Sequence, residues 1–241
     1  IDSNTLSDLL RANLIPESYM PPLQIVQLRE LLRYRATRTR KRASFKVKVR
    51  EVLSREGKTC EFTDVTTKRA RLWINTIELD ELNRHELDVF IHFIDEMTKE
   101  IKLLDKRIEQ EQFKYPETEL LKSIIGINTY SAMLIIAEVG DFMRFETPDK
   151  LASYAGVVSS TYQSSNSCYN GKITKQGSKW LRWILVQCVH AAIKTRKSHK
   201  IKRFYARIAK RRGTKKAVVA TARKMLTIIW HLIDKNQSYA Y

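Results

Sequence analysis

A segment rich in hydroxyl groups, residues 159–167, contains the residue types in this chain that could do covalent chemistry. It reads Ser-Ser-Thr-Tyr-Gln-Ser-Ser-Asn-Ser and is followed by Gly-Lys-Ile-Thr-Lys-Gln-Gly at 171–177. A serine oxygen is a weak nucleophile at neutral pH unless a base, a metal ion or dense positive charge stabilises its alkoxide. Positive charge is close in the sequence, at Lys172, Lys175, Lys179 and Arg182.

Phosphoryl transfer is the reaction that suits these residue types. A serine Oγ would attack a phosphorus atom, cations would neutralise the phosphate oxygens, and a divalent metal would activate the nucleophile or the leaving group. A Ser-His-Asp triad has no local support, because no histidine lies between residues 153 and 179. The alternative interpretation of the segment is a flexible polar linker, and the residue types alone do not decide between the two.

The composition favours a nucleic acid as the source of the phosphate. The chain has 241 residues and a formal net charge of +18, from 44 Lys and Arg against 26 Asp and Glu, and such an excess attracts polyanions. Hydrophobic residues make up 43% of the chain, which is enough for a folded protein. Three cysteines without CxxC spacing support neither a disulfide framework nor a zinc site, and predict a cytoplasmic protein. The longest apolar run, 133–137, is too short to span a membrane.

Scarce glycine and proline, with apolar residues at helical spacing, predict a mainly α fold. We expect helices at about 6–12, 23–53, 178–194 and 214–233, a second helical region after Gly57, and two short helices within 119–154. Pro16, Pro21 and Pro22 separate the first helix from the second. Three parts follow: 1–22, a basic helix with a coiled-coil region at 23–113, and a compact helical domain at 114–241.

A heptad pattern runs through the second helical region. Its members are Leu87, Phe90, Ile94, Met97, Ile101, Leu104 and Ile108. Such a pattern requires a partner helix. The partner could be the 23–53 helix of the same chain, which would form a long helical hairpin, or the same pattern in a second subunit, and the sequence leaves both open.

Between Arg29 and Arg50, the helix at 23–53 carries ten cations and a single acid, Glu30. Like charges at this density repel one another unless a polyanion neutralises them, so we expect a nucleic acid to bind here. The candidates are Arg29, Arg33, Arg35, Arg38, Arg40 and Arg42. The alternative is a solvated basic face that serves solubility.

Within 119–154, a pattern of apolar residues around Gly126-Ile127-Asn128 resembles a helix-hairpin-helix, whose turn would present backbone amides to a DNA phosphate. The pattern consists of Leu120, Ile124, Gly126, Ile127, Ala132, Leu134 and Ile135. An ordinary αα-hairpin in a hydrophobic core explains the pattern equally simply. Glu138 and Asp141 lie three residues apart, and helix capping and solvation explain them better than a metal site does.

Several motifs together resemble the IS110 family of insertion-sequence transposases. The most specific motif begins at Ala155-Gly156-Val157-Val158-Ser159-Ser160, continues through Tyr162 and Ser164-Ser165, and ends at Leu181-Arg182. Asp2 with Asp8-Leu9-Leu10-Arg11 resembles the end of the family's N-terminal RuvC-like domain. Leu28-Arg29-Glu30-Leu31 resembles its basic linker helix, and Arg212-Gly213 with Lys215-Lys216-Ala217 resembles its C-terminal helix.

The resemblance implies a DNA recombinase. The family's catalytic serine maps to Ser164, with Ser160 as the second choice, and the last of four acids that hold Mg²⁺ maps to Asp2. Most members have Pro at 159 and Gly at 165, where this chain has serines, so the turn geometry differs. The other three acids would lie upstream of Ile1, so we expect a fragment that lacks most of the RuvC-like domain and is inactive alone.

The resemblance also implies the partners: DNA, a guide RNA and other subunits in a homo-oligomer. Nucleic-acid contacts would come from the cations already named and from Arg211, Arg212, Lys215 and Lys216. Two other functions remain open. The chain could be a non-catalytic helical module that binds DNA or RNA, or a metal-dependent junction nuclease in which acids act and no covalent adduct forms.

Overall fold

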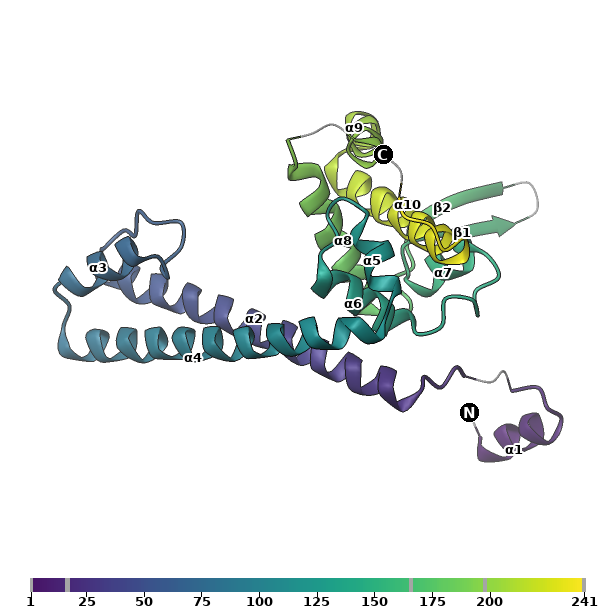
Figure 1. The fold of residues 1–241 in the computed structure, drawn as a ribbon, viewed down its shortest axis with the longest axis horizontal. Helices are drawn as coiled ribbons and strands as arrows, with labels where there is room; N and C mark the ends of the chain where they lie inside the picture. The colour runs from purple at the N-terminus through teal and green to yellow at the C-terminus, as the bar shows by residue number, and fades with distance from the viewer. Residues whose placement is uncertain (1, 16–17, 165–166, 197–198, 240–241) are drawn as a thin grey trace.

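The computed structural model describes residues 2–15, 18–164, 167–196 and 199–239, and for 161–164, 167–170 and 172 it describes the backbone only. The chain is mainly α-helical, as predicted, with a long arm and a compact C-terminal domain (Figure 1). The helices are α1 Ser3–Arg11, α2 Leu23–Arg55, α3 Lys68–Thr76, α4 Glu81–Glu111, α5 Glu117–Lys122, α6 Thr129–Val139, α7 Pro148–Tyr154, α8 Lys179–Lys194, α9 Lys200–Arg212 and α10 Thr214–Asp234. Within these described ranges, no helix is both long and apolar enough to cross a bilayer.

The arm consists of α2 and α4, which pack side by side, with α3 across their far end (Figure 1). α2 begins directly after Pro22, which has no backbone N–H to contribute, and α4 begins at the Asp80 cap, whose carboxylate accepts from the Asn83 amide at 2.9 Å. The buried side chains of α4 are Leu87, Ile94, Ile101 and Ile108, every seventh residue. The heptad pattern therefore pairs with α2 within the chain.

The C-terminal domain is built around α6. Every residue from Ser131 to Val139 is buried, because α6 packs against α2, α5 and α8 together. This helix contains the longest apolar run in the sequence, so that run is a core helix. α10 closes the domain by packing on α5, α7, α8 and α9.

Three segments differ from the sequence prediction. The region predicted to hold two short helices holds three, α5, α6 and α7. The hydroxyl-rich segment, for which the sequence predicts no strand, forms a hairpin: Ser159–Ser164 is β1 and Ser167–Ile173 is β2, paired antiparallel. Its Thr and Tyr residues favour strands, and the many serines conceal that preference. The basic segment before the last helix is itself a helix, α9, whose apolar residues Ile201, Phe204, Tyr205 and Ile208 recur at helical spacing.

Candidate functional site

The two-stranded hairpin carries both candidate serines and projects from the C-terminal domain (Figure 1). Ser160 lies at its base, beside an irregularity in pairing between Ser159 and Thr161. Ser164 lies at the outer end, where its backbone pairs with Ser167. Four residues of strand separate the two serines by about 13 Å, so they could not serve the same reacting phosphate in one position. The Ser164 side chain lies outside the described atoms.

The base of the hairpin is held by close backbone contacts between its two ends. A Cβ added at Gly156 would lie 2.2 Å from the Gln176 carbonyl oxygen, and one at Gly177 would lie 1.8 Å from the Tyr154 carbonyl oxygen. Both glycines have positive φ, at +64° and +82°, a region that side chains rarely adopt. Arg182, predicted to bind nucleic acid, donates from Nη1 to the Ala155 carbonyl at 3.1 Å. The sequence thus fixes where the hairpin leaves the domain.

A buried carboxylate lies beneath the hairpin base. The Glu138 side chain is 1% exposed and accepts two hydrogen bonds from Arg33, at 2.7 and 2.8 Å. It also accepts from the Ser178 hydroxyl at 2.7 Å. Ser178 is the N-cap of α8, since its Oγ accepts from the Leu181 amide at 3.1 Å. The hydrogen bond that Arg33 donates to Glu138 raises the pKa of Arg33 above its ordinary value.

These contacts correct the sequence interpretation of Glu138. It is neither solvated nor a cap, because its carboxylate is buried and paired across more than 100 residues of chain. Arg29 strengthens the same junction: its guanidinium donates to the Ala137 carbonyl and, at 3.1 Å, to the Glu138 carbonyl. α2 is therefore attached directly to the helix that supports the hairpin.

Other arginines of α2 also find partners within the chain. Arg35 pairs with Asp105 at 2.9 Å and Arg38 with Glu100 at 3.2 Å, while Arg42 donates to the Thr98 hydroxyl at 3.3 Å. The acids missing from the 23–53 segment come from α4 and α6. Neutralising α2 therefore does not require a polyanion, although nucleic-acid contacts by these residues stay a prediction. Arg40 instead lies over the Trp180 ring, 5.5 Å from its centroid.

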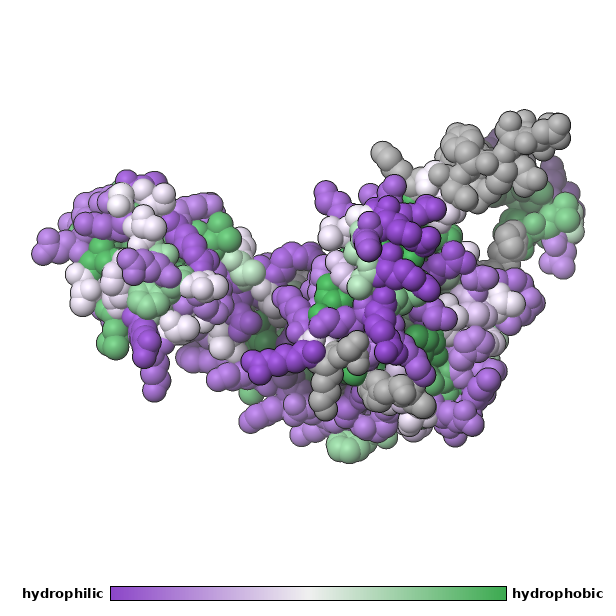
Figure 2. Space-filling view, turned by 90° about the horizontal axis from the view of Figure 1, so that it is seen from above, coloured by the Kyte–Doolittle hydropathy of each residue, from purple (hydrophilic) through white to green (hydrophobic). Residues whose placement is uncertain are grey.

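A basic groove opens beside the hairpin, with a volume of about 880 Å³. Val157, Ile173, Phe204, Ile208, Val219 and Ala220 form its apolar part. Its cations come from the α9–α10 junction and the following turns: Arg211, Arg212, Lys215, Lys216, Arg223 and Lys224. Ser159 lines the same groove, one residue before Ser160. In Figure 2 the face that includes α9 is largely hydrophilic.

Charge in this groove is poorly compensated. No Asp or Glu occurs between residues 150 and 233. Asp149 pairs with Arg223 at 2.8 Å, and the four predicted cations Arg211, Arg212, Lys215 and Lys216 have no carboxylate partner in the part of the chain that the structure describes. α10 also begins without a side-chain cap, so its first amides remain available to an anion. The long acid-free run is the sequence signal that adds Arg223 and Lys224 to the predicted set.

The remaining predicted cations lie in the second strand of the hairpin or follow it in the chain. Lys175 is exposed with φ of +55°, and Lys179 is exposed at the first position of α8. The side chain of Lys172 lies outside the described atoms. The predicted helix-hairpin-helix segment forms α5 and α6 with α6 buried in the core, so its contact with DNA stays a prediction.

Asp2 does not form part of a metal site in the described residues. Its carboxylate caps α1 by accepting from the Asn4 amide at 3.3 Å. Nowhere in the described ranges do three His, Cys, Asp or Glu side chains come together in a way that could hold a metal ion. The donor set present therefore does not fit Mg²⁺ by itself.

Comparison with known proteins confirms the family resemblance. Residues 118–206, which run from α5 through α6, α7, the hairpin and α8 into α9, match the Transposase IS116/IS110/IS902 family. The chain is 27% identical over 175 residues to the transposase for insertion sequence element IS1111A of Coxiella burnetii, which covers 72% of this chain and 44% of that protein. It is 26% identical over 141 residues to a probable family 20 transposase of Pseudomonas aeruginosa, covering 58% and 42%.

A third relative is named for a different role. The pilin gene-inverting protein of Moraxella bovis is 29% identical over 154 residues, covering 61% of this chain and 46% of that protein. The chain thus spans less than half the length of each of these three relatives.

Proposed function

We propose that this chain, whose resemblance to IS110-family transposases is confirmed, is the strand-exchange portion of a DNA transposase that acts through Ser164. The observation that carries the proposal is the hairpin with its base beside a groove of uncompensated cations. A DNA segment that runs from the groove along the hairpin would bring its backbone to Ser164. The names of the relatives, transposases and a gene-inverting protein, describe the same class of reaction.

In the proposed reaction the Ser164 Oγ loses its proton and forms an ester bond to a backbone phosphorus. The phosphorus bond to one deoxyribose oxygen breaks, and that oxygen takes up a proton as it leaves. The phosphoserine ester keeps the bond energy, so a hydroxyl of another strand can attack the phosphorus and release the serine. Two charges on the phosphate oxygens need stabilising during each step, and lysines and arginines near the hairpin supply that stabilisation.

The groove would hold the DNA backbone through Lys215, Lys216, Arg211 and Arg212. Phosphate contacts of this kind fix position without reading sequence. The apolar part of the groove would lie against the deoxyribose rings. The family's Mg²⁺ is part of the proposal for a full-length protein, with Asp2 as one carboxylate ligand. We derive no step through the metal, because the described residues do not assemble a binding set. A guide RNA and assembly into a homo-oligomer belong to the same proposal.

The test is a recombination assay with a full-length transposase that contains this chain. Ser164→Ala is expected to retain DNA binding and to yield no recombined product, while Ser160→Ala retains activity. Recombination by Ser164→Ala at the wild-type rate would contradict the proposal. If neither serine substitution changes any measured property and the protein binds nucleic acid without recombining it, the chain is a non-catalytic binding module. If DNA strands are cut and no covalent protein–DNA adduct forms, the protein is a metal-dependent nuclease.

A further inference from the structure

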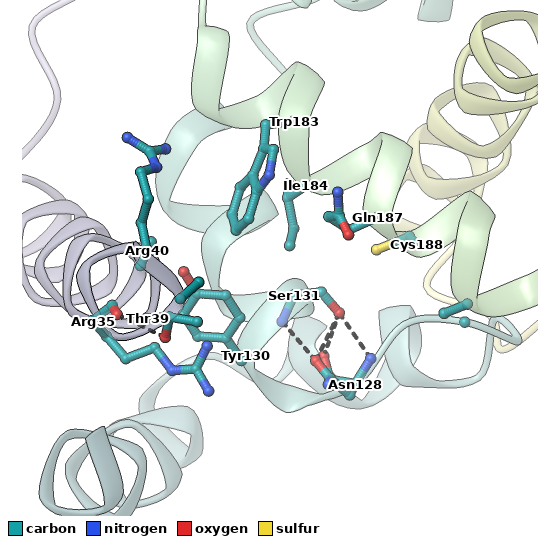
Figure 3. Close-up of a pocket in the computed structure, with 14 residues that line it drawn as sticks. Arg35, Thr39, Arg40, Asn128, Tyr130, Ser131, Trp183, Ile184, Gln187 and Cys188 are labelled. Atoms are coloured by element: carbon teal, nitrogen blue, oxygen red, sulfur yellow. Dashed lines mark hydrogen bonds between the residues drawn. The ribbon is translucent and has the colours of Figure 1, made fainter. Parts of the chain in front are cut away.

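A second cavity, of about 500 Å³, lies between α2, the start of α6 and α8 (Figure 3). It is separate from the basic groove, since the two share no lining residue. α2 contributes Arg35 and Arg40, α6 contributes Tyr130, and α8 contributes Trp183 and Gln187. No carboxylate lines it. A cavity of this size at the junction of the arm and the domain is large enough for a nucleotide.

The aromatic residues of the cavity have different roles. Tyr130 is committed to the fold: its hydroxyl donates to the Leu32 carbonyl at 3.1 Å, and the Arg35 guanidinium lies 4.3 Å from its ring centroid. Burial raises the pKa of Tyr130 to about 12, so its hydroxyl stays neutral at physiological pH. Trp183 is only half-buried and extends from α8 into the cavity (Figure 3). Its indole therefore offers an apolar, π-rich surface to a ligand.

Some polar groups of the cavity are likewise satisfied within the fold, and others are available to a ligand. Asn128 and Ser131 satisfy each other in the capping box of α6, and Arg35 is neutralised by Asp105. Gln187 is exposed, and its amide makes no hydrogen bond to the described part of the chain. Arg40 is exposed at the mouth, where it contacts the ring of Trp180 and has no carboxylate partner among the described residues. Trp180 in turn touches Trp183, with ring centroids 5.9 Å apart.

We propose that this cavity binds one unstacked nucleotide of a single-stranded segment. The base stacks on Trp183, the Gln187 amide bonds its edge, and Arg40 contacts the adjoining phosphate. An aromatic face beside an arginine is a common platform for single-stranded nucleic acid, because every base has a π-face. A base inside a duplex cannot enter, since its faces are covered by its neighbours. The inference rests on the proposed function only in requiring that the chain binds nucleic acid.

Photocrosslinking tests the location directly. Single-stranded DNA and RNA oligonucleotides carrying 5-iodouracil are bound to the full chain, irradiated, and the crosslinked peptide is identified by mass spectrometry. The expected crosslinked peptide contains Trp183 or Tyr130. The oligonucleotide that gives the higher crosslinking yield, DNA or RNA, identifies the ligand. Crosslinks confined to the groove or the hairpin would overturn the proposal.

Affinity measurements provide the matched variants. Loss of base stacking corresponds to a weakening of about 5- to 150-fold, so Trp183→Ala should lower single-strand affinity by that factor, whereas Trp183→Phe keeps most of it. Arg40→Ala should weaken binding more than Lys41→Ala, the neighbouring exposed cation that does not line the cavity. Unchanged single-strand affinity in folded Trp183→Ala would refute the site. Trp183→Phe guards against a folding defect, because it preserves an aromatic side chain.

Failure of this inference and failure of the proposed function give different results. Duplex binding through the groove should be unaffected by Trp183→Ala, and recombination by Ser164→Ala has no bearing on the cavity. If a peptide binds the cavity and no oligonucleotide displaces it, the cavity is a site for a protein segment and the nucleotide proposal is overturned.

Discussion

The Arg33 guanidinium holds the buried Glu138 carboxylate in a two-point contact that joins the arm to the C-terminal domain. The same carboxylate accepts from Ser178, the cap of the helix that follows the hairpin. One residue thus links α2, α6 and the start of α8. Through Gly177, the residue before Ser178, that junction adjoins the Tyr154 backbone at the hairpin base.

Replacing Arg33 and replacing Glu138 should lower the free energy of unfolding by different amounts. The Glu138 side chain is 1% exposed and the Arg33 side chain is 41% exposed. Arg33→Met leaves a buried carboxylate without its counter-ion and should lower the free energy of unfolding by about 3 kcal/mol. Glu138→Gln should cost less, because the freed arginine can reach water. Urea denaturation of both variants measures the difference. Equal costs, or a loss below about 0.5 kcal/mol for Arg33→Met, would show that the junction is not what holds the arm.

Substitution at the hairpin base should disrupt its position. Gly177→Ala places a Cβ 1.8 Å from the Tyr154 carbonyl oxygen, so backbone must move. We expect a loss of at least 3 kcal/mol in stability, or faster hydrogen exchange confined to residues near the base. Gly57→Ala is the matched control: φ is also positive, at +66°, but nothing lies within 4 Å of the added Cβ. It should cost about 1–2 kcal/mol. Similar effects at both glycines would contradict close packing as the cause.

Charge reversal in the groove should weaken DNA binding. Lys215→Glu with Lys216→Glu removes two uncompensated cations and introduces repulsion. If about six phosphates are contacted, wild-type affinity should fall with a log-log salt slope of about −5, and the double variant should have a slope shallower by about 2. The control is Lys102→Glu with Lys106→Glu on the exposed face of α4. An equal effect of the control pair would indicate non-specific attraction by net charge.

Stability of the arm should depend on pH through Asp64. The amide of Thr66 is the main cause that lowers the pKa of Asp64 from 3.8 to about 2, and Lys46 also contributes. Because the folded-state pKa is depressed, its stabilisation is fully present above pH 4 and disappears as the pH falls through the range from 3.8 to about 2. Asp64→Asn should therefore be less stable than wild type at pH 7, and the gap should narrow below pH 4. A pH-independent difference in thermal melting would exclude the carboxylate as its source.

Periodic patterns predicted several of the helices, because an apolar stripe marks the buried face whichever element covers it. The α4 heptads, the core helix at 129–139 and the final helix follow from apolar spacing, which survives in any context that offers a partner. The hairpin was missed because strand formation depends on cross-strand pairing between residues of both halves, such as Ser159 with Ile173. Helix α9 was missed because its cations outnumber its apolar residues.

The sequence shows which residues of the candidate site are cationic, but not which of those cations are paired with acids inside the chain. The sequence predicts Lys215 and Lys216 as binding residues, and in the structure they line a groove with Arg211 and Arg212. Arg33, Arg35 and Arg38 carry the same charge, yet each meets an acid from a distant segment: Glu138, Asp105 and Glu100. Counting charges within one segment cannot reveal ion pairs between residues about 60 to 105 positions apart in the chain. The tertiary fold therefore separates cations available to a ligand from cations that hold the arm.

The most direct test of the central claim is to isolate the protein–DNA adduct. A full-length transposase containing this chain is reacted with substrate DNA, quenched, digested with nuclease and protease, and examined by mass spectrometry. The account predicts a nucleotide esterified to Ser164, present in Ser160→Ala and absent in Ser164→Ala. An adduct on Ser160, or recombination that proceeds with no protein–DNA ester at any stage, would contradict it.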